Sequence, residues 1–90
     1  MDFLAKIYVT LKPTVNDPQG ITVLSALRNL GFTAPANVRV GKYLEVSLEA
    51  ESQDDAAAQV EEMCKKLLAN TVIEQYRFDL EESVAQKPGV

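Results

Sequence analysis

The sequence predicts an α+β fold, a two-layer sandwich in which an antiparallel sheet carries two helices on one face. Two observations support this prediction. Apolar and polar residues alternate in three stretches, which is typical of strands with one buried face. Between these stretches, apolar residues recur every three or four positions, as they do in amphipathic helices. The elements therefore follow the order strand, helix, strand, helix, strand.

The first strand is predicted over residues 3–11, where every second residue is apolar. A helix over residues 18–30 follows, because Asp17 is a favourable N-cap and Pro18 suits the first helical position. Gly31 is expected to end this helix in a left-handed conformation. The apolar stripe of the predicted helix consists of Val23, Leu24, Leu27 and Leu30.

Residues 38–48, in the middle of the chain, are predicted to be extended, and Gly41 interrupts them. This glycine indicates either a hairpin turn or a bulge in one long bent strand, and we favour a tight turn or sharp bend. The element order is thus β-α-β-β-α-β, or the same with the middle strands as one bent strand. Either order resembles a ferredoxin-like split βαβ unit.

The second helix is expected to begin at Ser52 or Asp54 as N-cap and to stop at Asn70 in a left-handed conformation. A short apolar anchor at residues 72–73 and a strand over residues 76–81 follow. Residues 1–81 are predicted to form a single domain, and residues 82–90 a flexible C-terminal tail. The apolar stripe of the second helix consists of Ala56, Val60, Met63, Cys64, Leu67 and Leu68.

Composition excludes several classes of function. The net charge of −4 and the scattered basic residues argue against nucleic-acid binding. No apolar run is long enough to span a membrane, and the N-terminus lacks the basic start of a signal peptide, so we expect a cytoplasmic protein. The chain has no histidine and one cysteine, Cys64, on an apolar stripe. We therefore expect no catalytic residue, no metal site and no bound cofactor.

Two polar strings stand at the ends of predicted elements, one at residues 11–20 and one at residues 38–43. Helix capping accounts for Asp17 and Pro18 but not for the residues on either side. Polar side chains at strand ends and turns are usually exposed, so we interpret both strings as surface that contacts a partner. Removing Lys12, Arg39 or Lys42 is then expected to leave the thermal midpoint of the isolated protein almost unchanged. The candidate residues are Lys12, Pro13, Asp17, Pro18, Gln19, Arg39, Gly41, Lys42 and Tyr43.

These two strings, together with Met63-Cys-Lys-Lys-Leu-Leu-Ala-Asn70, resemble the PurS family. Its members are the small subunit of phosphoribosylformylglycinamidine (FGAM) synthase. The resemblance runs from about residue 3 to residue 81, with the strings in the same order and spacing. Thr14 and Thr71 depart from the pattern, because the family commonly has glycine and proline at these loop positions.

The resemblance implies a PurS-like fold and a non-catalytic role in de novo purine biosynthesis. Such a subunit bridges the glutaminase PurQ and the synthetase PurL, supports ammonia transfer, and forms a homodimer or homotetramer. The complex uses ATP, Mg and glutamine, and the small subunit itself binds no cofactor. An ACT-type regulatory domain that binds a small molecule is the alternative from another class. ACT domains are usually fused to the enzyme they control, which favours the free subunit for a chain of 90 residues.

Overall fold

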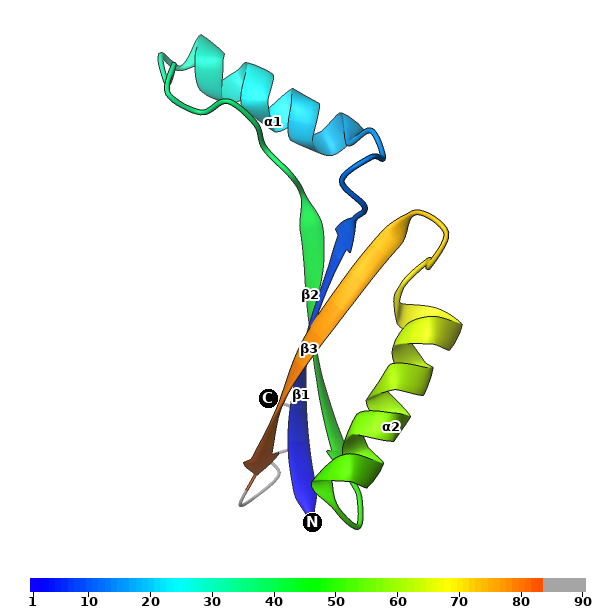
Figure 1. Cartoon of the computed structure of the whole chain (residues 1–90). Coiled ribbons are helices and arrows are strands. Elements are labelled where there is room, and N and C mark those ends of the chain that lie inside the picture. Colours follow the sequence, from blue (N-terminus) through cyan, green and yellow to red (C-terminus); the bar gives the residue numbers. More distant parts are fainter. Residues whose placement is uncertain (84–90) are drawn as a thin grey trace.

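The computed structural model describes residues 1–83 and shows one three-stranded antiparallel sheet with two α-helices (Figure 1). Strand β1 (Asp2–Leu11) lies in the centre, between β2 (Gly41–Glu49) and β3 (Glu74–Ser83). Both neighbours run antiparallel to β1. The predicted α+β class and the three alternating strands are confirmed.

The core lies between one face of this sheet and α2 (Gln53–Met63). Ile7 pairs with Leu44 on one side and Phe78 on the other, so all three strands present apolar side chains at the same level. The hydroxyl of Tyr76 on β3 also donates a 2.6 Å hydrogen bond to Glu61 on α2. The buried apolar residues of the core are Phe3, Ala5, Ile7, Val9, Ala50, Ala56, Val60, Cys64 and Ala69.

Helix α2 begins as predicted but ends differently. Ser52 is the N-cap, and its Oγ accepts a 3.1 Å hydrogen bond from the N–H of Asp55. The last turn, η1 (Cys64–Leu68), is a π-helix in which the N–H of Ala69 donates to the carbonyl of Cys64. Because the wider π-helical turn holds an extra residue, Leu67 leaves the apolar stripe and is 82% exposed.

Two further local predictions are wrong around this turn. Asn70 does not adopt a left-handed conformation, because no non-glycine residue within 1–83 has a positive φ. Its side-chain oxygen instead accepts from the N–H of Val72 at 3.2 Å and closes a turn. Val72 is 78% exposed, so it does not anchor the chain to the core.

Helix α1 (Pro18–Asn29) lies beyond the end of the sheet rather than on its face (Figure 1). The prediction that both helices cover the same face is therefore wrong for α1. Within α1 only Gly20 is buried. An apolar stripe identifies a helix but not the surface that covers it, which explains the error. The prediction that Gly31 ends this helix in a left-handed conformation is confirmed, because its φ is 98°.

The middle of the chain contains one strand and no hairpin. Residues 33–40 form an irregular connection, and Gly41 is the first residue of β2. Strand β3 extends to Ser83, so the first two residues of the predicted tail belong to the sheet. The rest of that tail, residues 84–90, lies outside the described residues. Within residues 1–83, no helix is long and apolar enough to cross a membrane.

Candidate functional site

The two polar strings meet in space between α1 and the sheet (Figure 1). We call the region formed by residues 11–20 and 38–43 the joint. One string leaves β1 and enters α1, and the other returns from α1 to β2. Hydrogen bonds link the two strings directly, although more than 20 residues separate the bonded groups. The joint thus contains every residue that the sequence marked as a candidate.

Asp17 lies at the centre of the joint and is only 4% exposed. Its Oδ1 accepts a 2.9 Å hydrogen bond from the N–H of Gly20, which confirms the predicted N-cap. Its Oδ2 accepts a 2.8 Å hydrogen bond from the N–H of Val40 in the other string. The prediction that Asp17 is exposed is wrong, because its second partner comes from a segment that sequence spacing cannot place.

Arg39 reaches across the joint and binds the backbone of the first string. One terminal nitrogen donates to the carbonyl of Val15 at 3.2 Å, and the other to the carbonyls of Lys12 and Leu11 at 2.9 and 3.3 Å. Its Nε lies 4.0 Å from Oδ2 of Asp17. Only a guanidinium offers this many donors in one plane. The prediction that Arg39 serves only as contact surface is therefore wrong.

The hydrogen bonds around Asp17 also change its titration. The N–H groups of Val40 and Gly20, and then the charge of Arg39, lower the pKa of the Asp17 carboxyl below its ordinary value of 3.8. Desolvation opposes this shift without reversing it. Because the pKa is lower in the folded state, the charged carboxylate stabilises the fold above pH 3.8. That stabilisation is lost as the pH falls through the folded-state pKa.

We expect Asp17→Asn to lower the thermal midpoint at pH 7. The difference in thermal midpoint between wild type and variant should shrink as the pH falls from 5 to 2. The amide keeps an N-cap oxygen but loses the charge and one of the two acceptors. Thermal unfolding followed by circular dichroism across this pH range measures the gap. Asp54→Asn, at an exposed carboxylate in the first turn of α2, controls for the loss of one negative charge. A gap that stays constant or widens toward low pH would contradict this result.

Other candidates keep accessible side chains. Tyr43 on β2 is 49% exposed, and its ring lies 5.1 Å from that of Tyr8. Its hydroxyl donates to Glu45 at 2.8 Å, and this bond raises the pKa of Tyr43 to about 12. Lys42 is exposed and forms no ion pair within residues 1–83. Lys12 is half-buried, and the remaining exposed candidates are Pro13, Pro18 and Gln19.

Two glycines allow backbone segments to pack closely in the joint. A Cβ on Gly41 would lie 2.5 Å from the carbonyl oxygen of Val9, so this glycine permits close strand contact and does not form a turn. A Cβ on Gly20 would lie 2.0 Å from the carbonyl oxygen of Val38. Sequence reasoning missed this role of Gly20. A glycine in the first turn of a helix, where it costs stability, was the available signal.

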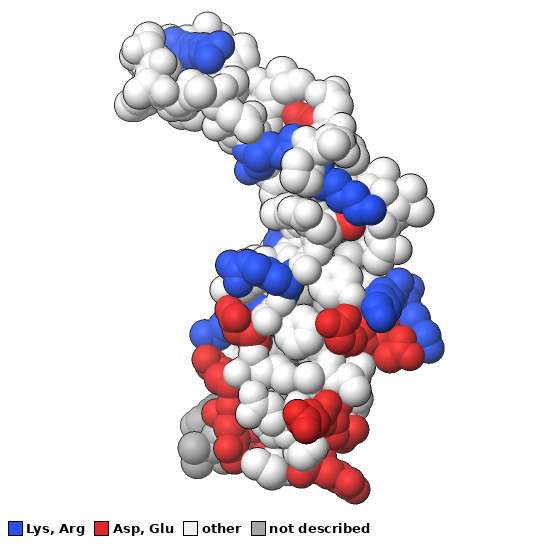
Figure 2. Space-filling model, viewed as in Figure 1, with Lys and Arg blue, Asp and Glu red and all other residues white. Residues whose placement is uncertain are grey.

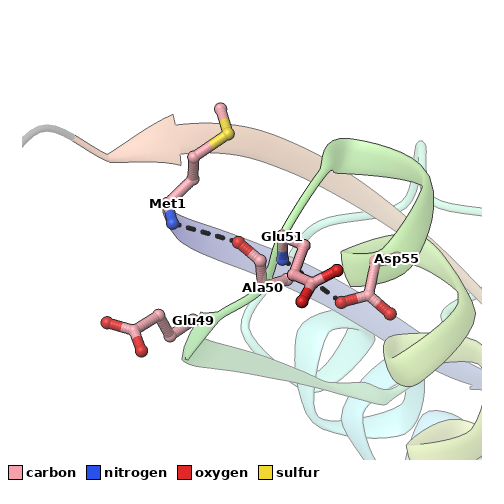
Figure 3. A pocket seen from close by; sticks show the side chains of 5 residues that line it. All are labelled: Met1, Glu49, Ala50, Glu51 and Asp55. Carbon is pink, nitrogen blue, oxygen red and sulfur yellow. Dashed lines mark hydrogen bonds between the residues drawn. The ribbon is translucent and has the colours of Figure 1, made fainter.

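Shallow hollows flank the joint. One of about 220 Å³ is lined by Gln19, Gly41 and Lys42 with Glu74 from β3. A larger hollow of about 530 Å³ lies at the opposite end of the sheet (Figure 3). There the ammonium of Met1 donates a 3.0 Å hydrogen bond to the carbonyl of Ala50. Within residues 1–83, no group of three or more potential ligand side chains is arranged to hold a metal. The remaining residues around the larger hollow are Glu49, Glu51 and Asp55.

Cys64 is fully buried between α2 and the sheet, as its position on the apolar stripe predicted. Burial, and then the charge of Glu61, raise the pKa of its thiol. A nucleophilic cysteine needs the opposite environment, one that stabilises the thiolate and admits a substrate. Cys64 therefore acts as a small apolar core residue.

Comparison with known proteins decides the family. The sequence profile of PurS, described as phosphoribosylformylglycinamidine (FGAM) synthase, matches residues 4–82. The chain belongs to the PurS family. The resemblance inferred from the two polar strings and residues 63–70 is thereby confirmed, and the ACT-type alternative is not favoured.

Individual PurS proteins match over nearly the whole chain. The PurS subunit of Bacillus subtilis FGAM synthase is 50% identical over 84 residues, which cover 93% of this chain and 99% of that subunit. The Synechocystis PurS subunit is 51% identical over 75 residues, covering 83% of this chain and 75% of that subunit. The fold agrees as well: a B. subtilis PurS structure matches with a TM-score of 0.82 at 49% identity, covering 89% of this chain and 99% of that one.

A further match comes from a larger assembly. A chain in the structure of PurLQS from Thermotoga maritima aligns with a TM-score of 0.80 at 31% identity. The alignment covers 92% of this PurS-family chain and 99% of the T. maritima chain. The fold of this chain is therefore similar to that of the T. maritima chain.

Proposed function

We propose that this PurS-family chain is the small, non-catalytic subunit of an FGAM synthase complex in purine biosynthesis. In that complex it joins the synthetase PurL and the glutaminase PurQ and supports ammonia transfer between them. The family match over residues 4–82 carries this proposal. The similarity to a chain of PurLQS from T. maritima supports the association with both partners. The compartment that fits such a biosynthetic subunit is the cytoplasm.

The chemistry of the chain supports a role without catalysis. It has no histidine to act as a general base, and its one thiol is buried with a raised pKa. The described residues offer no grouped metal ligands. We therefore assign ATP, Mg and glutamine to the partner subunits, and no cofactor to this chain.

The distribution of charge supports a bridging role. Figure 2 shows Lys and Arg from α1 and the joint down to the middle of the molecule, and Asp and Glu mainly toward the opposite end of the sheet. Lys12, Arg39 and Lys42 belong to the first region. Glu49, Glu51 and Asp55 surround the hollow in the second (Figure 3). Two ends of opposite charge present chemically different surfaces, as a subunit with two different partners requires.

Reconstitution with the PurL and PurQ subunits of the same organism tests the proposal. We expect the isolated chain to hydrolyse neither glutamine nor ATP, and the three-subunit mixture to show glutamine-dependent FGAM synthesis. Lys42→Ala should leave the thermal midpoint unchanged while weakening assembly on the order of tenfold, the effect of about 1.4 kcal/mol. Synthesis driven by added ammonia should suffer less, because it does not need the glutaminase.

Lys65→Ala is the matched control, since it removes another exposed lysine, one on η1 and away from the joint. Glutamine hydrolysis by the isolated chain would contradict the non-catalytic role. Undiminished glutamine-dependent synthesis by PurL and PurQ without this chain would contradict the bridging role. Wild-type assembly of the Lys42→Ala variant would remove Lys42 from the proposed contact surface.

A further inference from the structure

Within a single chain, helix α1 has little to hold it in place apart from the joint. It protrudes beyond the sheet, and the two connecting segments are its only covalent links to the rest of the fold (Figure 1). Of its residues only Gly20 is buried. An element attached in this way would swing about its connections unless these were tied to one another.

The joint supplies such ties in both directions. Asp17, at the end of the outgoing segment, accepts the N–H of Val40 in the returning segment at 2.8 Å. Arg39, in the returning segment, donates to the carbonyls of Lys12 and Val15 in the outgoing segment at 2.9 and 3.2 Å. Each segment thus binds the backbone of the other through a charged side chain, and the two side chains lie within 4.0 Å.

The same ties connect the joint to the elements on each side. Oδ1 of Asp17 caps α1 through Gly20, and the guanidinium of Arg39 also reaches the carbonyl of Leu11, the last residue of β1. The backbone of Val38 packs so closely against Gly20 that there is no room for a Cβ on Gly20. The start of α1, the end of β1 and the segment entering β2 therefore form one connected unit.

We propose that Asp17 and Arg39 form a clamp that fixes α1 in a single orientation relative to the sheet. This inference concerns the conformation of the chain and does not depend on the proposed function. Its consequence for binding is general: a partner that contacts α1 loses less conformational entropy when the helix is already held in place. Arg39 and Asp17 are thus positioning residues for α1.

Hydrogen exchange of the full-length protein, followed by mass spectrometry, tests the clamp. Arg39→Ala should accelerate exchange in peptides from α1 by about tenfold or more, because each lost charge-assisted hydrogen bond costs more than a neutral one. Peptides from β1 and β3 should keep wild-type rates. Arg39→Lys should behave like Arg39→Ala, since a single ammonium nitrogen cannot replace the two terminal nitrogens that bind separate carbonyls. Lys42→Ala is the control, because it removes a positive charge from the joint that forms no ion pair within residues 1–83.

A distance measurement provides a second readout. Spin labels on cysteines introduced at two exposed serines, Ser25 on α1 and Ser47 on β2, report the orientation of α1 relative to the sheet. Labelled protein is diluted into unlabelled protein so that only distances within one chain contribute. We expect a narrow distribution in wild type and a broad one in Arg39→Ala.

Three results would overturn the clamp. One is an Arg39→Ala variant with wild-type exchange in α1 and a narrow distance distribution. Another is equal acceleration in α1 and in the sheet, which would mean that Arg39 stabilises the whole fold. The third is full rescue by Arg39→Lys, which would assign the effect to charge rather than to the guanidinium fork.

Discussion

Val23→Glu/Leu30→Glu is expected to convert the free protein from a homodimer or larger homo-oligomer into a monomer. Val23 lies on α1 and Leu30 is its C-cap residue seven positions later, and the two side chains are 41% and 74% exposed in the single chain. Ile21 on α1 and Phe32 just after it, at 56% and 55% exposed, extend this apolar surface. So much exposed apolar surface on one element indicates an interface with another chain.

The length of α1 leads to the same expectation. It has 12 residues, and a helix of about that length is only marginally stable in water without tertiary packing. The sheet does not supply that packing, because α1 lies beyond its end (Figure 1). A second copy of the chain would supply it in the free protein, and a partner subunit in the complex.

Light scattering at tens of micromolar measures the effect. Wild type should have at least twice the monomer mass of 9.9 kDa, and the double variant should have the monomer mass. Ser25→Glu/Asn29→Glu is the matched control, because it adds the same charge on the opposite side of α1. Self-association through α1 is refuted if wild type is monomeric, or if both double variants keep the wild-type mass.

Gly20→Ala is expected to destabilise the joint, although glycine to alanine normally stabilises a helix by about 0.5–1 kcal/mol. The added Cβ would lie 2.0 Å from the carbonyl oxygen of Val38 and 3.0 Å from Oδ2 of Asp17. The first contact is with backbone, which cannot rotate away as a flexible side chain can. The segment that carries Val40 must then move, and its hydrogen bond to Asp17 is strained.

We expect a loss of about 1–3 kcal/mol, as for overpacking in a tight interior. For a chain of this size, each kcal/mol corresponds to a fall of about 4–8 °C in the thermal midpoint. Glutamine-dependent activity of the reconstituted complex should fall with it. Ser25→Ala, at an exposed position of the same helix, should be neutral or slightly stabilising. A thermal midpoint for Gly20→Ala at or above that of wild type would show that α1 does not pack against Val38 in solution.

Secondary structure and family membership followed from the sequence because both depend on local order along the chain. Alternation at residues 3–11 predicts β1 since side chains of a strand point to opposite faces. Asp17-Pro18 predicts the start of α1 because capping involves only neighbouring residues. The two polar strings and residues 63–70 together pointed to the family, which the match over residues 4–82 confirms.

The roles of the same residues depended on contacts between distant segments. Asp17 is equally good as an exposed cap and as a buried link to Val40, and only the returning chain decides between them. Arg39 follows no local pattern, since its carbonyl partners lie 24 to 28 residues earlier.

The position of α1 was undetermined for a related reason. Its apolar stripe requires a covering surface, and the same stripe satisfies that requirement on the sheet of its own chain or on another chain. The sequence by itself therefore determined the elements and the family of this protein. Only the tertiary structure decided that α1 lies beyond the end of the sheet and that Asp17 and Arg39 connect it to the sheet. Long-range hydrogen bonding and burial arise only when the chain is folded.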